Sequence, residues 1–543
     1  MKSWGTIIVT AFGFLMGLIL AGVGVTSAKT YFLSDKSIEK KAEAYWQDTG
    51  LSSKELYQLI SNNSCQSSEK YFLACVNSIT QILPKFHLKL SSQTGQITSS
   101  VLASDDDGRS EKENLQPFIK MYEKQNNLLV NFELIWHDLL DKERSESSKS
   151  YLVGVGINSF LSVYKDPHTY ILPSQFFEEV GSKFERSNLF VGLAFEKKEN
   201  HILVRKVFKG SDAEKAGLKS KDEILEINGI KSEKLNFFDI SSILKESEFK
   251  QFYFKIKRNK IVENIEVKRS FTKLNHVLVE KESGLRDYSV ITLAKFSRGV
   301  CAEVSKKIKS MTGESIAGMI LDLRDNPGGE LNEAACLAGL FLGINKKIYS
   351  VKYFDPLKSD EVVLTTGSLL YTGPLVLLIN SSSASASELL AGALQDYNRA
   401  ALVGERTFGK GTFQEGEIWS KNSQITLFRT QGFYLLPSGV SPQLKGITPD
   451  LIQDEDRVTQ REETTYFNPI LANPEFESKF DHKLEAEKGT QSKSTQFASE
   501  FKKCLPSLSF SKDDKILQLG LETLSCHRIS SFMAGQYSID EFN

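Results

Sequence analysis

The sequence lacks several features that would place it in a common functional class. Its formal net charge is −1 over 543 residues, which argues against a nucleic-acid-binding surface. It has six cysteines and seven histidines, but no His-Glu-x-x-His motif and no cysteine pair at metal-ligand spacing. We therefore expect no metal and no cofactor. The length and the 40% hydrophobic content predict three to four domains with ample core.

The most informative residues form a small-residue turn between two apolar segments. An apolar run, 374–379, leads into Ser383-Ala-Ser-Ala-Ser-Glu388, and apolar residues then recur at helical spacing. A strand, a tight turn and a helix place a nucleophile at a helix N-terminus, where unpaired N–H groups and the helix dipole favour a developing anion. Lys410 follows between two glycines, and Gln414 lies four residues further on. The arrangement predicts a serine–lysine hydrolase.

A lysine base suits this segment because no histidine lies near it in the sequence; the nearest, His276 and His482, stand in segments without a catalytic signature. A lysine accepts a proton only when it is neutral, and burial among apolar groups lowers its pKa. Phe408 and Phe413 flank Lys410 and supply apolar surroundings. An amide at Gln414 could hold the amine by hydrogen bonding without a carboxylate that would keep the lysine charged.

The segment from Ser383 to Gln414 resembles the C-terminal processing (tail-specific) peptidases. By this resemblance Ser385 is the nucleophile, Lys410 the base and Gln414 the assisting glutamine, although Ser383 or Ser387 could in principle take the nucleophile's place. The resemblance extends over about residues 150 to 455. It includes three further segments: Asp322-Leu-Arg-Asp-Asn-Pro-Gly-Gly329, Asp166-Pro-His-Thr-Tyr170 and Gly446-Ile-Thr-Pro-Asp450.

A tetrahedral intermediate also needs hydrogen-bond donors. The backbone N–H groups of Ala386, directly after the nucleophile, and of Gly328 are the candidates for an oxyanion hole, because glycine permits a close backbone approach. Asp396 closes the nucleophile helix and is interpreted as a structural hydrogen-bonding residue rather than part of a proton relay.

A second module precedes the catalytic segment. From 188 to 269 the sequence reads as short strands around Gly210-Ser-Asp-Ala-Glu-Lys-Ala-Gly-Leu218 and Asp222-Glu-Ile-Leu-Glu-Ile-Asn-Gly229. It resembles a PDZ domain, which implies capture of a peptide's free C-terminal carboxylate and addition of the peptide as an extra strand. The resemblance assigns the carboxylate-binding loop to Gly192, Leu193, Ala194 and Phe195. A purely structural β insert is the alternative.

The N-terminus bears on location. An uncharged apolar stretch, 6–25, follows Lys2 and is long for the apolar h-region of a signal peptide but just long enough to span a bilayer. A signal peptide or a membrane anchor over 1–28 is expected, and either places the rest of the chain outside the cytoplasm, for example in a periplasm.

The cysteines agree with export. Cys65 and Cys75 are close in sequence, as are Cys504 and Cys526, so we predict a local disulfide for each pair. Cys301 and Cys336 lie in the expected protease core, and we predict that they are buried thiols.

Strands alternate with helices between 290 and 403, which predicts a layered α/β domain with parallel connections. The resemblance implies a crotonase-like form of this core. The expected fold is thus an α+β multidomain chain: a signal peptide or anchor (1–28), a mainly helical N-terminal region (30–185), a PDZ domain (188–270), a serine protease core (275–458) and a C-terminal extension (460–543).

The sequence therefore predicts an exported serine endopeptidase whose substrates are proteins or peptides recognised through free C-termini. A non-catalytic PDZ scaffold is the alternative, and an acyl-CoA enzyme of the crotonase-like fold is disfavoured because it needs neither the dyad nor a PDZ module. An activator or adaptor protein and a homo-oligomer are left open as partners.

Overall fold

The computed structural model of the chain describes residues 45–86, 88–99, 111–124, 130–175, 191–198, 201–207, 211–232, 251–268, 277–282, 287–311, 316–453, 461–467, 469–470 and 514–526. The predicted signal peptide or anchor over 1–28 and the predicted disulfide partner Cys504 lie outside these residues. Within them, no helix is both long and apolar enough to cross a membrane.

The N-terminal unit is helical, with one small hairpin. Its core gathers buried aromatic and aliphatic side chains, among them Trp136, Tyr151 and Phe160. Ser145 caps the longest helix by accepting a hydrogen bond from the Ser148 N–H. The elements are α4 (Ser53–Tyr57), α5 (Asn62–Cys65), α6 (Glu69–Thr80), a 3-10 helix (Leu83–Phe86), β1 (Leu88–Leu90), β2 (Ile97–Ser99), α7 (Glu111–Lys124), α8 (Phe132–Lys142) and α9 (Glu146–Tyr164).

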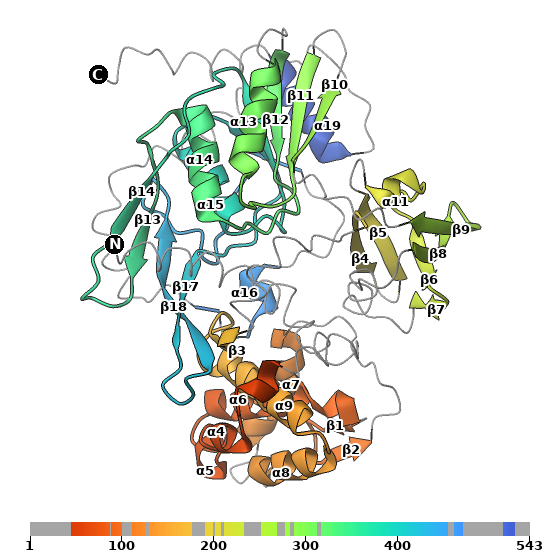
Figure 1. Ribbon diagram of the computed structural model, residues 1–543, viewed down its shortest axis with the longest axis vertical. Helices are drawn as coiled ribbons and strands as arrows, with labels where there is room; N and C mark the ends of the chain where they lie inside the picture. Colours follow the sequence, from red (N-terminus) through yellow and green to blue (C-terminus); the bar gives the residue numbers. More distant parts are fainter. Residues whose placement is uncertain are drawn as a thin grey trace.

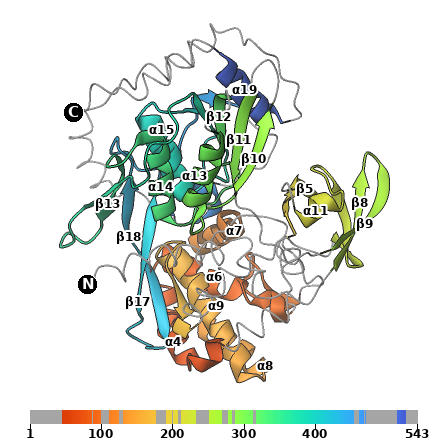
Figure 2. The same ribbon diagram turned by 45° about the horizontal axis from the view of Figure 1, so that its top comes forward.

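A separate antiparallel sheet follows, to one side of the other units in both views (Figure 1, Figure 2). Buried and exposed residues alternate along β8, as expected for a strand with one face on a core. The strand order is β4-β5-β6-β8-β9, with β7 paired to β6. The elements are β4 (Leu193–Lys198), β5 (His201–Val207), α11 (Asp212–Lys215), β6 (Glu223–Ile227), β7 (Ile230–Lys231), β8 (Gln251–Arg258) and β9 (Ile261–Lys268).

The core is built on a six-stranded sheet of order β10-β11-β12-β15-β16-β19. All its pairs are parallel except β10 with β11, and every residue of β15 is buried, as parallel strands covered on both faces require. The predicted parallel α/β core is confirmed. Its elements are β10 (Val277–Glu282), β11 (Asp287–Leu293), α13 (Val300–Met311), β12 (Ile316–Asp322), α14 (Leu331–Leu342), β15 (Leu375–Ile379), α15 (Ala386–Asp396), β16 (Ala401–Gly404) and β19 (Leu451–Ile452).

A second sheet, antiparallel and not anticipated from the sequence, joins this core to the N-terminal helices. Its order is β14-β13-β18-β17, and β3 pairs with β18. The β17–β18 hairpin reaches down to the helical unit, where Trp419 and Ile425 enter the N-terminal core (Figure 1). The strands are β3 (Tyr170–Pro173), β13 (Lys347–Tyr353), β14 (Glu361–Leu364), β17 (Thr412–Ile418) and β18 (Ile425–Leu435).

Two elements come from the region after the core. Helix α19 (Lys515–Ser525) packs Ile516, Leu521 and Leu524 on one face of the parallel sheet, opposite α13, α14 and α15. The short helix α16 (Glu462–Thr465) lies between the core and the N-terminal helices (Figure 1).

The cysteines differ from the prediction in one respect. Cys65 and Cys75 form a disulfide, and Cys526 is also disulfide-bonded. Cys301 and Cys336, however, are joined to each other and are not thiols. The prediction was wrong because it treated the two helices separately, whereas α13 and α14 pack side by side and bring the two cysteines together.

Candidate active site

Ser385 occupies a strained turn at the start of α15. Its φ of 57° and ψ of −115° are unusual for a residue with a side chain, and it is 1% exposed. Backbone strain of this kind is maintained only where the surrounding contacts impose it. The turn follows β15 directly, so the parallel sheet positions it.

Hydrogen bonds distinguish the three serines of the turn. The Ser383 hydroxyl donates to the Leu323 carbonyl and the Ser387 hydroxyl to the Asn326 carbonyl, each at 2.8 Å. Both side chains thereby bind the Ser385 turn to the 322–329 turn. The buried Ser385 Oγ has no hydrogen-bond partner in the described part of the chain. Ser385 is therefore the hydroxyl of the three that has no structural hydrogen bond.

Glu388 is a site residue whose role the sequence reasoning missed. Its carboxylate is fully buried and accepts four hydrogen bonds. Oε2 accepts from the backbone N–H groups of Ser385 and Lys410 at 2.8 and 2.9 Å, and Oε1 from the Thr407 hydroxyl and the Gly409 N–H at 2.6 and 2.7 Å. Burial raises the pKa of Glu388 to about 7, while the donors lower it. One carboxylate thus holds the serine turn against the lysine turn.

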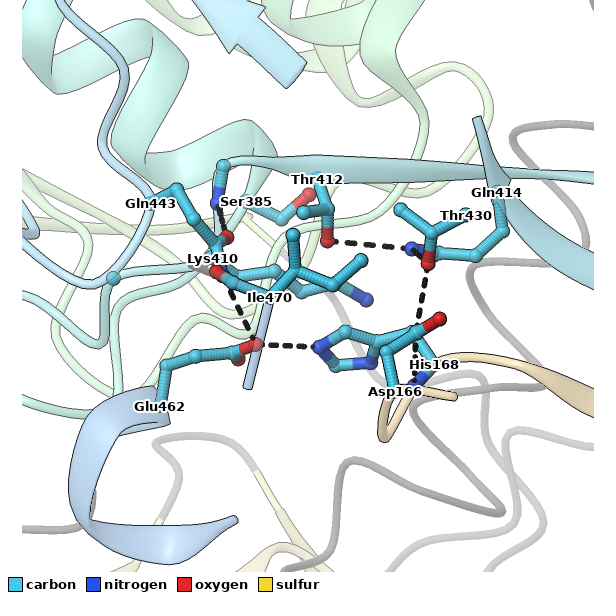
Figure 3. Close-up of polar contacts among 12 residues, drawn as sticks. Asp166, His168, Ser385, Lys410, Thr412, Gln414, Thr430, Gln443, Glu462 and Ile470 are labelled. Atoms are coloured by element: carbon cyan, nitrogen blue, oxygen red, sulfur yellow. Dashed lines mark hydrogen bonds and ion pairs between the residues drawn. The ribbon is translucent and has the colours of Figure 1, made fainter. Parts of the chain in front are cut away.

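Lys410 lies in a buried polar cluster (Figure 3). It is 2% exposed, and burial lowers its pKa to about 8 against the carboxylates of Glu462, Asp166 and Glu388, which raise it. In Figure 3 the lysine side chain runs between Thr412 and His168. A pKa near 8 leaves a substantial fraction of neutral amine at mildly alkaline pH, which is the form able to accept a proton.

Gln414 lies near the lysine, and its side-chain amide is hydrogen-bonded to two threonines. Its Nε2 donates to Thr412 Oγ1 at 3.3 Å and to Thr430 Oγ1 at 3.2 Å, and Thr430 Oγ1 donates to Asp166 Oδ1 at 2.8 Å. Gln414 therefore belongs to the hydrogen-bond network that lines the lysine pocket.

His168 also reaches this cluster, although it lies far away in the sequence. Its Nε2 is 2.8 Å from Oε1 of Glu462, which is 294 positions later, and both side chains are buried. The expectation that no histidine lies near the lysine held for the linear sequence only. The resemblance already marked Asp166–Tyr170, but nothing in the sequence pointed to Glu462.

The proposed oxyanion donors lie beside Ser385 but differ in their present hydrogen bonding. Gly328 has a φ of 100°, and a Cβ built on it would come within 2.7 Å of the Ala384 carbonyl oxygen and 3.0 Å of the Ala386 nitrogen. The two candidate groups are therefore neighbours. The Gly328 N–H, however, donates to Asn326 Oδ1 at 2.9 Å, so it is engaged within its own turn.

The candidate peptide-binding residues lie at the start of β4, an edge strand of the sheet β4-β5-β6-β8-β9 among the described residues. Leu193 and Phe195 are buried, and Gly192 has a φ of 90°, at which a Cβ would lie 2.0 Å from Ser211 Cβ. The backbone of Ala194 pairs with Lys206 of β5. Asp396, interpreted as structural, accepts a hydrogen bond from the Ser438 N–H at 2.8 Å.

Comparisons with known proteins agree with these two units. Residues 287–453 match the sequence model of peptidase family S41, and residues 190–268 match that of the PDZ domain. The resemblance to C-terminal processing peptidases with a PDZ domain is therefore confirmed.

Among similar proteins, the carboxy-terminal processing protease CtpA of Bacillus subtilis (strain 168) is 30% identical over 309 residues, which are 55% of this chain and 65% of that protein. A probable CtpA-like serine protease of Staphylococcus aureus (strain bovine RF122 / ET3-1) is 28% identical over 331 residues, 60% of this chain and 65% of that protein. The chain thus covers slightly less than two thirds of these relatives. The solved photosystem II D1 C-terminal processing protease is 24% identical with a TM-score of 0.41, covering 61% of this chain and 89% of that one.

Proposed function

We propose that this chain is a serine endopeptidase with Ser385 as nucleophile and Lys410 as general base, because residues 287–453 match the sequence model of peptidase family S41 and residues 190–268 match that of the PDZ domain. The observation that carries the proposal is the Glu388 carboxylate, which binds the backbone of both residues and so fixes the two turns together. A hydroxyl without a structural partner and a buried amine of lowered pKa are the two groups that this chemistry needs.

The chemical steps follow from these two groups. The neutral amine of Lys410 takes the Ser385 hydroxyl proton as Oγ attacks the scissile carbonyl carbon, and the carbonyl electrons move to its oxygen. The Ala386 N–H, at the start of α15, stabilises this oxyanion, joined by Gly328 once its N–H leaves Asn326. The ammonium then gives its proton to the departing peptide amine. Water, deprotonated by Lys410, attacks the ester, and the carboxylate product leaves as Ser385 regains its proton.

A rearrangement must precede this reaction, because the Ser385 hydroxyl is not hydrogen-bonded to Lys410 in this structure. Catalytic hydrogen bonds often tighten only when substrate is bound. Gln414 is proposed to align the lysine indirectly, since it orders Thr412 and Thr430 along the pocket.

The PDZ domain is proposed to deliver substrates. β4 is an edge strand of its sheet among the described residues, so a peptide can pair with it as a further strand. Gly192, Leu193, Ala194 and Phe195 would bind the terminal carboxylate through backbone N–H groups. The substrates are then proteins or peptides with free C-termini, and binding at the PDZ domain gates the shift of Ser385 toward Lys410.

Export is proposed from the cysteines and the N-terminal segment. Three disulfide-bonded sites occur in the described residues, at Cys65–Cys75, Cys301–Cys336 and Cys526, and disulfides persist in oxidising compartments. With the apolar segment in 1–28 as signal or anchor, the catalytic part is extracytoplasmic.

Two assays on the full chain test the proposal. A fluorophosphonate, which reacts with an activated serine with loss of fluoride, should label Ser385 as located by peptide mass spectrometry. An unstructured protein with an apolar C-terminus should be cleaved, and amidation of that C-terminus should slow cleavage at least tenfold. Ser385→Ala and Lys410→Ala should abolish both signals, whereas Ser382→Ala, which changes a neighbouring half-buried serine, should retain them.

The outcomes distinguish a serine endopeptidase from a non-catalytic PDZ scaffold. Cleavage that persists in Ser385→Ala would refute the nucleophile assignment. Binding of the free C-terminus without labelling or cleavage would favour the non-catalytic PDZ scaffold, in which the unpartnered Ser385 hydroxyl is never activated. Equal cleavage of free and amidated substrates would remove the PDZ domain from substrate recognition.

A further inference from the structure

We propose that residues 461–467 and 469–470, which we call the strap, close the pocket of the proposed base, and that Glu462 in the strap is a positioning residue for Lys410. The strap lies beyond the region that matches the peptidase family, which ends at 453. The inference rests on the proposed function of Ser385 and Lys410, and it adds a residue that neither the matched region nor the sequence motifs contain.

The strap is attached to the peptidase core on one side. The Glu462 N–H donates to the Phe408 carbonyl at 3.0 Å, two residues before the lysine. Gln443 Nε2 donates to the Ile470 carbonyl at 3.1 Å, and Glu463 forms an ion pair with Arg406. Both ends of the strap are therefore fixed around the lysine turn.

The other side of the strap is attached to the N-terminal helical unit. The Phe467 N–H donates to Glu111 Oε1 at 3.0 Å, and Lys112 Nζ donates to the Glu463 carbonyl at 3.4 Å. Glu111 and Lys112 both lie in α7. The rings of His168 and Tyr466 meet edge to face at 5.4 Å. The strap thus joins two distant parts of the chain across the lysine pocket.

The Glu462 carboxylate contacts two residues of the cluster around Lys410, His168 and Gln443 (Figure 3). Its Oε1 lies 2.8 Å from His168 Nε2 and 3.4 Å from Gln443 Nε2. Gln443 in turn accepts the Gly411 N–H at 2.8 Å, directly after the lysine. The carboxylate therefore sets the position of the histidine on one side and, through Gln443, of the lysine turn on the other.

The charges around Lys410 distinguish Glu462 from the other carboxylates. Three face the lysine: Glu462 from α16, Asp166 from the segment before β3, and Glu388 from α15. Glu388 accepts four hydrogen bonds, and Asp166 accepts from the His168 N–H and from the Thr169 and Thr430 hydroxyls. Glu462 Oε2 is buried without a hydrogen-bond partner in the described part of the chain, so its charge is the least compensated.

The strap therefore acts on the lysine in two opposing ways. By excluding water it lowers the pKa of Lys410, and by its carboxylate it raises that pKa, with Glu462 the largest of the three electrostatic causes. His168 moderates the second effect because it binds one oxygen of the carboxylate. The balance sets the pH at which the amine becomes neutral.

The experiment is the pH dependence of Ser385 labelling by the fluorophosphonate, measured on the full chain. Labelling should rise with pH through the pKa of Lys410, because only the neutral amine accepts the serine proton. Glu462→Gln keeps the shape and a hydrogen-bond acceptor but removes the charge, so the midpoint should fall by about one pH unit. Well below the midpoint, labelling relative to its plateau should then be about tenfold faster.

Two further variants make the result specific. Glu463→Gln changes the next residue of the same strap, whose side chain is 38% exposed. It leaves the hydrogen bonds of the Glu462 N–H and the Ile470 carbonyl that attach both ends of the strap, so the midpoint should stay in place. His168→Ala removes the partner of Glu462 and admits water, so its midpoint should rise. This second shift tests the proposal even if Glu462→Gln folds poorly.

Each remaining outcome counts against the proposal. A midpoint that does not move in Glu462→Gln, or that moves equally in Glu463→Gln, would reduce the strap to a structural contact. A gain in labelling rate at every pH with an unmoved midpoint would make the strap an inhibitory lid. Absence of Ser385 labelling in the unmodified chain would instead refute the proposed function, and this inference with it.

Discussion

The backbone N–H groups of Ser385 and Lys410 donate to the same oxygen, Oε2 of Glu388, at 2.8 and 2.9 Å. The two residues come from different turns, one before α15 and one before β17. Their relative position is therefore fixed by a third side chain and does not depend on a contact between their own functional groups.

We expect Glu388→Gln to damage both stability and reactivity. The amide keeps one acceptor oxygen, so buried N–H groups in the serine or lysine turn lose their partner, each at about 1–3 kcal/mol. The free energy of unfolding in urea should fall by about 2–4 kcal/mol, and Ser385 labelling should slow at least tenfold. Glu333→Gln is the control, because Glu333 also accepts two backbone N–H groups, from Gly299 and Cys301, but none from the serine or lysine turn. Equal loss of labelling in both variants would contradict the role given to Glu388.

Gly328→Ala should inactivate the site by steric conflict. A Cβ at this position would lie 2.7 Å from the Ala384 carbonyl oxygen and 3.0 Å from Ser385 Cβ, on a backbone with φ of 100°. We expect at least a hundredfold loss in the rate of Ser385 labelling. Gly299→Ala has the same kind of backbone strain, with φ of 87°, but meets nothing within 4 Å. If the two variants lost labelling equally, strain and not the contact with the nucleophile would be the cause.

The Cys301–Cys336 disulfide should help to hold the 322–329 turn in place beside Ser385. It closes a loop of 35 residues that contains the 322–329 turn, and loss of such a crosslink costs about 2–4 kcal/mol of stability. Replacing both cysteines by alanine should lower the free energy of unfolding by this amount and slow Ser385 labelling. Replacing Cys65 and Cys75, in the N-terminal unit, should destabilise the chain without changing labelling of the remaining folded protein. Unchanged labelling in the first variant would show that α13 and α14 hold the turn without the crosslink.

Lys410 should make stability depend on pH. Its pKa falls from 10.5 to about 8 on folding, so between these values the unfolded chain binds more protons than the folded one. Stability from this group therefore rises with pH across the window and is constant below it. Relative to Lys410→Met, the free energy of unfolding of the unmodified chain should rise by about 3 kcal/mol from pH 8 to 10.5. A constant difference between the two proteins would mean that the lysine is not desolvated in solution.

The local part of the site could be predicted from the sequence because it lies on short segments with a strong pattern. The buried run before Ser385 and the apolar helix after it define a strand, turn and helix, and these are β15 and α15. The parallel strands β11, β12, β15 and β16 were predicted for the same reason. The short-range periodicity of apolar residues indicates whether one face or both faces of an element are buried. These strands and this helix all show such a pattern.

The pocket around Lys410 could not be predicted, because it is assembled from distant segments. His168 and Glu462 are 294 positions apart, and neither stands in a pattern that predicts the other. The Cys301–Cys336 pairing failed similarly, since it depends on how α13 and α14 pack. Gln414 was expected to hold the lysine amine, but Thr412 and Thr430 are its hydrogen-bond partners, and they come from neighbouring positions of the second sheet.

The late position of helix α19 in the sequence limits the order in which the chain can fold during synthesis. The helix covers one face of the parallel sheet, and Asp514 just before it accepts a hydrogen bond at 2.7 Å from Arg324, a residue of the 322–329 turn that is bound to the Ser385 turn. A ribosome has made every strand of this sheet before the helix emerges. Until then Ile320, Val376 and Leu378 lack the apolar cover that α19 provides. The growing chain therefore cannot bury both faces of this sheet until α19 has been made, well after the last strand, β19.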